Sequence, residues 1–155
     1  MNESPAVRGI EDRLLTFEIG GSVYALPIGC VVEVCEAEPW ACVPMLPRET
    51  AGVMNHHGDA VPVLRRSALL GIDPAEREEP TQVLVLSPRP TEGARLGLPV
   101  DRIVGLVEGV GAASRDASPV AERRNIDGRV VSILDPERLV SKARETIEHS
   151  LERSG

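Results

Sequence analysis

The sequence predicts a mostly β protein made of two similar halves, each a small barrel of about five strands, followed by a C-terminal α-helix. Short Val-rich segments alternate with turns that contain Gly or Pro, which is typical of strands. Parts of the sequence recur about 70 residues later, and a regular apolar stripe near the end indicates a helix. A chain of 155 residues can bury about 70% of the surface it exposes when unfolded, so such halves can build a stable core.

The first half begins with a predicted hairpin. Residues 1–13 are polar and predict a loose tail. The strand-like segments 14–19 and 22–26 flank Gly20-Gly21, and Gly readily adopts the positive φ angles of a tight hairpin turn. The apolar segment 28–34 fits either a short helix or a strand, and the pattern alone does not decide between them.

A second hairpin is predicted further along the first half. Segments 52–55 and 60–64 form its strands, with Gly58-Asp59 at or near the turn. Residues 67–70 predict a single helical turn that ends at a glycine. Residues 73–80 are acidic and bounded by prolines, so we expect an exposed linker between the halves.

The second half contains three further strand-like segments, at 82–86, 96–100 and 129–134. Residues 111–125 are small and polar and predict a flexible loop. The part of this loop that corresponds to the segment 52–55 is charged and poor in strand formers. We therefore expect the second barrel to lack a strand there.

The final segment, 136–153, predicts an α-helix. Asp135 is well placed as its N-cap, with Pro136 at the first helical position. Four apolar residues spaced by four form one stripe: Leu139, Ala143, Ile147 and Leu151. The stripe either docks on the barrel of its own chain or presents a helix to a partner.

The internal repeat is the most informative feature of the sequence. Residues 25–34 align with 97–106, and residues 58–64 align with 128–134 in the same order. The repeat predicts a duplicated unit of hairpin, short apolar segment, hairpin and helical turn. The first barrel is expected over about 14–80 and the second over about 81–142, with elements free to interleave. Closed barrels leave no exposed sheet edges, so they suit such units.

Composition argues against several classes of function. The formal net charge of −7 and the three aromatic residues argue against nucleic-acid binding and against anionic membrane surfaces. The N-terminus has no pattern of a signal peptide, and no apolar stretch is long enough to span a bilayer. A cytoplasmic protein with reduced thiols is therefore expected.

Neither a metal site nor an active site is predicted. His56 and His57 are adjacent, and neighbouring residues of a strand point to opposite faces, so one ion is not expected to reach both rings. Cys30, Cys35 and Cys42 lack the short paired spacing of a zinc site. No cofactor motif or catalytic signature is recognised. The prediction is a protein that is not an enzyme, with a metal- or thiol-dependent enzyme as the least favoured alternative.

Several short segments occur in an order and spacing typical of one family. They are 17–19, 24–28, 31–34, the prolines Pro44 and Pro47, 52–58, 61–65, 96–101 and 132–135. Together they resemble the CheW family of chemotaxis adaptors over residues 14–142. The resemblance implies two SH3-like five-stranded barrels that share a core. It also implies a non-catalytic scaffold that couples chemoreceptors to a CheA-type histidine kinase, in the cytoplasm or recruited to receptor arrays at the inner membrane.

The resemblance also assigns binding residues. The kinase-binding face matches Val31, Glu33 and Val34, with neighbours in the 36–45 loop. The receptor-binding groove between the barrels matches Asn55, His57 and Gly58, but His57 stands where the family has an arginine. A histidine lacks the permanent charge and rigid donor fork of arginine. The alternative is therefore a divergent adaptor that regulates a single partner, or acts as its decoy, in a non-motility pathway.

Overall fold

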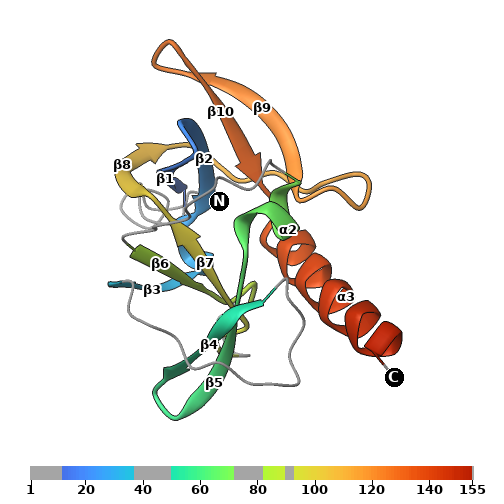
Figure 1. Cartoon of the computed structure of the whole chain (residues 1–155). Coiled ribbons are helices and arrows are strands. Elements are labelled where there is room, and N and C mark those ends of the chain that lie inside the picture. The colour runs from blue at the N-terminus through green and yellow to red at the C-terminus, as the bar shows by residue number, and fades with distance from the viewer. Residues whose placement is uncertain (1–11, 37–49, 72–81, 90–92, 155) are drawn as a thin grey trace, which may run out of the picture.

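The computed structural model describes residues 12–36, 50–71, 82–89 and 93–154, and Figure 1 shows their arrangement. This part of the chain forms ten strands, a 3₁₀ turn and two helices. The predicted linker 73–80, Cys42 and nearly all of the predicted N-terminal tail lie outside the described residues. The elements are β1 Arg13–Ile19, β2 Ser22–Pro27, η1 Ile28–Cys30, β3 Val31–Glu36, β4 Thr50–His56, β5 Asp59–Leu64, α2 Arg66–Leu70, β6 Gln82–Leu86, β7 Leu96–Val100, β8 Arg102–Glu108, β9 Val120–Ile126, β10 Arg129–Leu134 and α3 Pro136–Ser154.

The strands form two five-stranded sheets that exchange segments between the sequence halves. The first sheet has the order β8-β1-β2-β10-β9, and the second sheet has the order β3-β6-β7-β5-β4. The N-terminal hairpin β1–β2 therefore joins three strands from the second half, and β6–β7 joins three strands from the first half. A boundary near residue 80 separates the sequence repeats but not the sheets. The fold is mostly β, with two SH3-like subdomains and a C-terminal helix, as predicted.

The two sheets are related element by element. If each of β1 to β5 is replaced by the strand five places later, and each of β6 to β10 by the strand five places earlier, one strand order becomes the other. The hairpins β4–β5 and β9–β10 both turn through two residues, His57-Gly58 and Asp127-Gly128, and all four have positive φ. These angles are those of a type I′ turn, which matches the twist of the flanking strands. The predicted duplication is therefore confirmed in three dimensions.

One expected gap is filled by a regular strand. The prediction that the second barrel lacks a strand was wrong, because β9 pairs with β10 along its length, from Arg129 opposite Ile126 to Leu134 opposite Val120. β9 lies at the edge of the first sheet and has no fully buried side chain. An edge strand needs little apolar character, since the ladder to its one neighbour supplies its hydrogen bonds. Its charged sequence is therefore compatible with a strand.

A single large core joins the sheets. Leu15 and Phe17 of β1 are buried in the same apolar cluster as Leu84 of β6 and Leu98 of β7. A smaller cluster lies within the first sheet and includes Ala25 and other small or branched side chains. The shared core explains how the hairpins can be exchanged between subdomains without leaving an unburied face.

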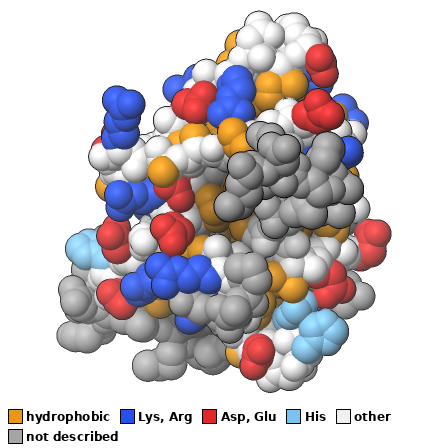
Figure 2. Space-filling model, turned by 180° about the vertical axis from the view of Figure 1, so that it is seen from behind, with side chains coloured by type: hydrophobic (Ala, Val, Ile, Leu, Met, Phe, Trp, Pro, Cys, Tyr) orange, Lys and Arg blue, Asp and Glu red, His pale blue; other side chains and the backbone are white. Residues whose placement is uncertain are grey.

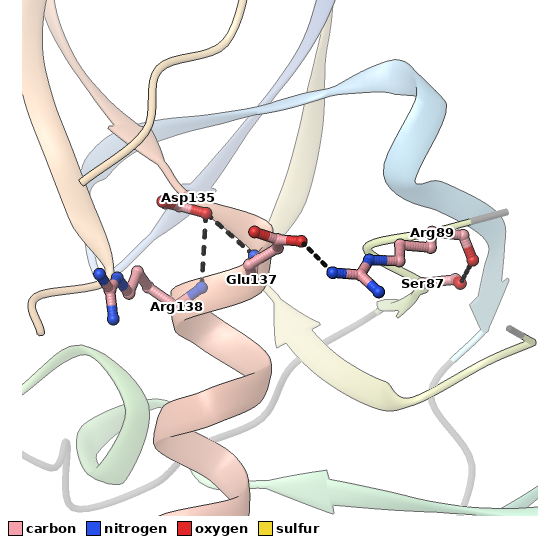
Figure 3. A network of polar contacts seen from close by, with 5 residues as sticks. All are labelled: Ser87, Arg89, Asp135, Glu137 and Arg138. Carbon is pink, nitrogen blue, oxygen red and sulfur yellow. Dashed lines mark hydrogen bonds and ion pairs between the residues drawn. The ribbon is translucent and has the colours of Figure 1, made fainter. Parts of the chain in front are cut away.

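Helix α3 packs on its own chain. Leu139 and Ala143 are buried in the shared core, and Ile147 packs against it, so the described part of the apolar stripe docks internally. Asp135 is the N-cap: its Oδ1 accepts hydrogen bonds from the backbone N–H groups of Glu137 at 3.0 Å and Arg138 at 3.4 Å (Figure 3). Both sequence predictions for the start of this helix are confirmed. Of the helices described, neither has the length and apolar character needed to cross a lipid bilayer.

Candidate binding surfaces

The first candidate surface lies on β3, an edge strand of the second sheet. A β-bulge between Val31 and Glu33 shifts the register of β3 against β6. A bulge interrupts the alternation of inward and outward side chains, so Val32, Glu33 and Val34 are all exposed. Val34 is 40% exposed and can contact a partner directly. Val31, predicted for the same face, instead packs partly buried against the core.

β8 presents an equivalent surface at the edge of the first sheet. The register of β1 against β8 shifts where Thr16 pairs with Gly105 and Phe17 pairs with Ile103, which leaves Val104 as the extra residue. Val104 and Leu106 are exposed. They occupy the positions that correspond to Val32 and Val34 in the sequence repeat. The molecule thus carries two bulged, apolar edges, of which the sequence resemblance indicated only the one on β3.

The residues predicted for the receptor groove form the β4–β5 turn. His57 has a φ of 52° and Gly58 a φ of 90°. The Asn55 side chain stabilises this turn, because its Oδ1 accepts the Gly58 N–H at 2.8 Å. His57 projects from the turn with 77% of its side chain exposed. Asn55 and Gly58 therefore shape the turn. All three residues are exposed, but the Asn55 side chain is engaged within the turn, whereas the His57 ring extends from it.

The structure brings His57 to the predicted kinase face. Glu33 Oε1 lies 2.8 Å from His56 Nε2 and 3.6 Å from His57 Nε2, so a residue of β3 contacts the β4–β5 hairpin. The two imidazole rings have centroids 4.3 Å apart and are nearly perpendicular. The expectation that the two rings diverge was wrong, because His57 lies in the turn and not in a strand. Figure 2 shows histidine side chains beside acidic ones on the surface.

The charge state of Glu33 follows from these contacts. A carboxylate only accepts hydrogen bonds, so His56 Nε2–H is the donor. This hydrogen bond lowers the pKa of the Glu33 carboxyl below its ordinary value, with smaller contributions from Cys35 and His57. His56 was not among the predicted site residues. One sequence signal could have indicated His56: both hairpin turns have the sequence Asn-X-X-Gly, at residues 55–58 and 125–128. A two-residue turn at His57-Gly58 makes His56 the last residue of its strand.

A polar cavity of about 720 Å³ lies at the N-terminal end of α3. Its lining includes four arginines, Arg89, Arg95, Arg138 and Arg144. Carboxylates at this end are engaged internally. Glu137 Oε1 lies 3.4 Å from Arg89 Nη2 (Figure 3), and Asp135 Oδ2 accepts the Ser114 N–H at 2.8 Å. The Asp135 hydrogen bond holds the loop before β9 at the start of the helix, and the Glu137 ion pair joins the helix to the segment after β6.

The fold defines a class of protein: a duplicated β domain whose two sheets exchange hairpins, with two bulged and partly apolar sheet edges among the residues described. The family of CheW-like domains matches residues 13–144, and the chain belongs to this family. Among solved structures, it is similar to the scaffolding protein TtCheW from Thermoanaerobacter tengcongensis. The TM-score is 0.66 and the sequence identity 18%, over 80% of this chain and 88% of that one. No curated protein matches the sequence.

Proposed function

We propose that this chain is a non-catalytic cytoplasmic adaptor of bacterial chemosensory signalling that couples chemoreceptors to a CheA-type histidine kinase. Membership of the CheW-like family supports the pathway. The observation that carries the proposal is the pair of equivalent apolar edges on β3 and β8. An adaptor has to contact more than one neighbour, and two related edges on one rigid core provide the surfaces for it.

The composition of these edges is that of a protein interface. On β3 the apolar Val32 and Val34 flank the charged Glu33, and on β8 Val104 and Leu106 lie between Arg102 and Glu108 at the ends of the strand. Apolar patches with charged rims are typical of interfaces. Exposed apolar edge strands promote aggregation unless they are covered. A partner bound at each edge would cover the apolar side chains there.

The test measures binding of the kinase regulatory domain and of a receptor cytoplasmic fragment by isothermal titration calorimetry. Val34→Asp and Val104→Asp each place a charge in one proposed interface and should weaken binding to the neighbour at that edge by about 10–100-fold. Val130→Asp is the matched control, because Val130 is 64% exposed but lies on β10, inside the first sheet. Equal binding by all three variants would exclude the edges as interfaces.

A second candidate function is a regulator that binds a single partner. The observation that favours it is His57, which stands where the family has an arginine and lies with its Nε2 3.6 Å from Glu33 Oε1. If this substitution abolishes receptor binding, the wild-type chain should bind the kinase domain alone, and His57→Arg should gain binding to a receptor cytoplasmic fragment. A ternary complex of wild-type chain, kinase domain and receptor fragment on size exclusion would instead establish the bridging role.

A further inference from the structure

Three metal-ligating side chains converge where β3 meets the β4–β5 turn. The carboxylate of Glu33 and one ring nitrogen from each of His56 and His57 lie within 4.8 Å of one another. His56 is held rigidly, with only 10% of its side chain exposed, while His57 and Glu33 are open to solvent. One fixed donor and two adjustable donors make a site that an ion can enter from solvent.

The donor set matches a known coordination chemistry. Two imidazoles and one carboxylate are a ligand set of zinc sites that keep a fourth position open. Donors on a tetrahedral Zn²⁺ with bonds of about 2.0–2.1 Å lie about 3.3 Å from one another. The Glu33 Oε1 distances of 2.8 Å to His56 and 3.6 Å to His57 bracket that value. The nitrogens of His56 and His57 lie within 4.8 Å of one another, so binding of one ion by all three donors requires rotation of the exposed Glu33 and His57 side chains.

The backbone places these donors together for reasons that do not depend on a metal. His57 has a left-handed φ of 52°, which turns its side chain out of the alternation of β4. Because His57 lies outside the strand, its ring and that of the adjacent His56 can both approach the Glu33 carboxylate. The equivalent turn of the second half has Ile126 and Asp127 at these positions, and Gly105 corresponds to Glu33 in the sequence repeat. The cluster is thus specific to the first half.

We propose that Glu33, His56 and His57 bind one divalent transition-metal ion, with Zn²⁺ as the best match, and that the ion links the two edge strands of the second sheet. β3 and β4 occupy opposite ends of the strand order of that sheet. Glu33 already joins them through His56, and a metal replaces this single hydrogen bond with three coordinate bonds. Coordination through Nε2 requires the neutral tautomer of His56 that carries its proton on Nδ1, so the proton leaves Nε2 for solvent as Nδ1 takes one up. The fourth position of the ion takes water or a donor from a partner. This proposal is independent of the adaptor role.

The test begins with full-length protein freed of metal by a chelator and titrated with ZnCl₂ in a calorimeter. We expect one Zn²⁺ per chain with a Kd of about 1–10 μM, weaker than structural sites with four protein ligands. His57→Ala should weaken binding by at least about 100-fold, since even outer-shell partners of metal sites contribute about 10–100-fold. His57 is exposed, so this variant should fold.

The matched control is His149→Ala, which removes the exposed histidine of α3 and should leave zinc affinity unchanged. Zinc at a hundredfold above its Kd should raise the Tm of the wild-type protein by about 5–10 °C, and that of His57→Ala by much less. Unchanged zinc binding in His57→Ala, or no stoichiometric binding by the wild type, would overturn the proposal.

Cobalt distinguishes this donor set from a thiolate site. Cys35 lies close enough to hydrogen-bond Glu33, so a sulfur ligand is the main competing arrangement. Co²⁺ bound by nitrogen and oxygen donors gives visible ligand-field bands without the near-ultraviolet charge-transfer band of a cobalt–thiolate bond. The nitrogen and oxygen spectrum supports the site, and a charge-transfer band that disappears in Cys35→Ser contradicts it.

Discussion

Replacing Asp135 with Ala should destabilise the protein more than any exposed carboxylate substitution. The Asp135 side chain is buried and connects two segments. It caps α3 through two backbone N–H groups (Figure 3), and it holds the loop before β9 through the Ser114 N–H. Loss of an N-cap costs about 1–2 kcal/mol. A partly buried N–H without a partner adds about 1–2 kcal/mol. The free energy of unfolding should therefore fall by about 2–4 kcal/mol.

Thermal and urea unfolding measure this loss. For a domain of this size, 2–4 kcal/mol corresponds to a Tm lower by about 5–15 °C. Asp135→Asn keeps one carbonyl acceptor and should lose less, because Asn is as good an N-cap as Asp. Glu137→Ala is the control, since its ion pair with Arg89 is exposed and should contribute less than about 0.5 kcal/mol. Equal stability of Asp135→Ala and Glu137→Ala would refute this role of Asp135.

Two further predictions concern the core. Burial raises the pKa of the Cys30 thiol from 9.0 to about 12, so iodoacetamide at pH 8.5 should label Cys30 only after unfolding in urea. Because the folded pKa is the higher one, the stability of the wild type should fall between pH 9 and pH 12, and Cys30→Ala should show a smaller fall. A Cβ at Gly97 would lie 3.0 Å from Val63 Cγ2 and 3.1 Å from Val83 Cγ1, so Gly97→Ala should cost about 1–3 kcal/mol in urea unfolding. Gly105→Ala, where a Cβ meets nothing within 4 Å, is its control, and equal losses would contradict the packing argument.

The features that local sequence predicts well are those with local causes. The Gly20-Gly21 turn, the Asp135 cap and the spacing of Leu139 and Ala143 are properties of neighbouring residues, and each is found as expected. The segment 28–34 was ambiguous because it contains both predicted states: the 3₁₀ turn η1 followed by the strand β3. β9 was missed because an edge strand carries a weak apolar signal.

In the candidate site, too, the local features were predicted from the sequence and the long-range contacts were not. The resemblance selected Val34 and Glu33, and both are exposed on an edge strand. The contact between Glu33 and the histidine pair joins residues 23 or more positions apart. It accompanies the bulge of β3 and the left-handed backbone of His57, a conformation that is uncommon for residues other than Gly. Neither feature has a clear signal in the sequence.

The sequence alone predicts a duplicated, mostly β domain with a C-terminal helix. Strand periodicity, turn residues and the repeat can each be recognised within short segments, without knowledge of distant contacts. The tertiary structure alone decided which sheet each hairpin joins. Both halves carry near-equivalent hairpins, so local pattern cannot distinguish pairing within a half from exchange between halves. Exchange places both hairpins against one shared core, and the same packing brings Glu33 to His56 and His57.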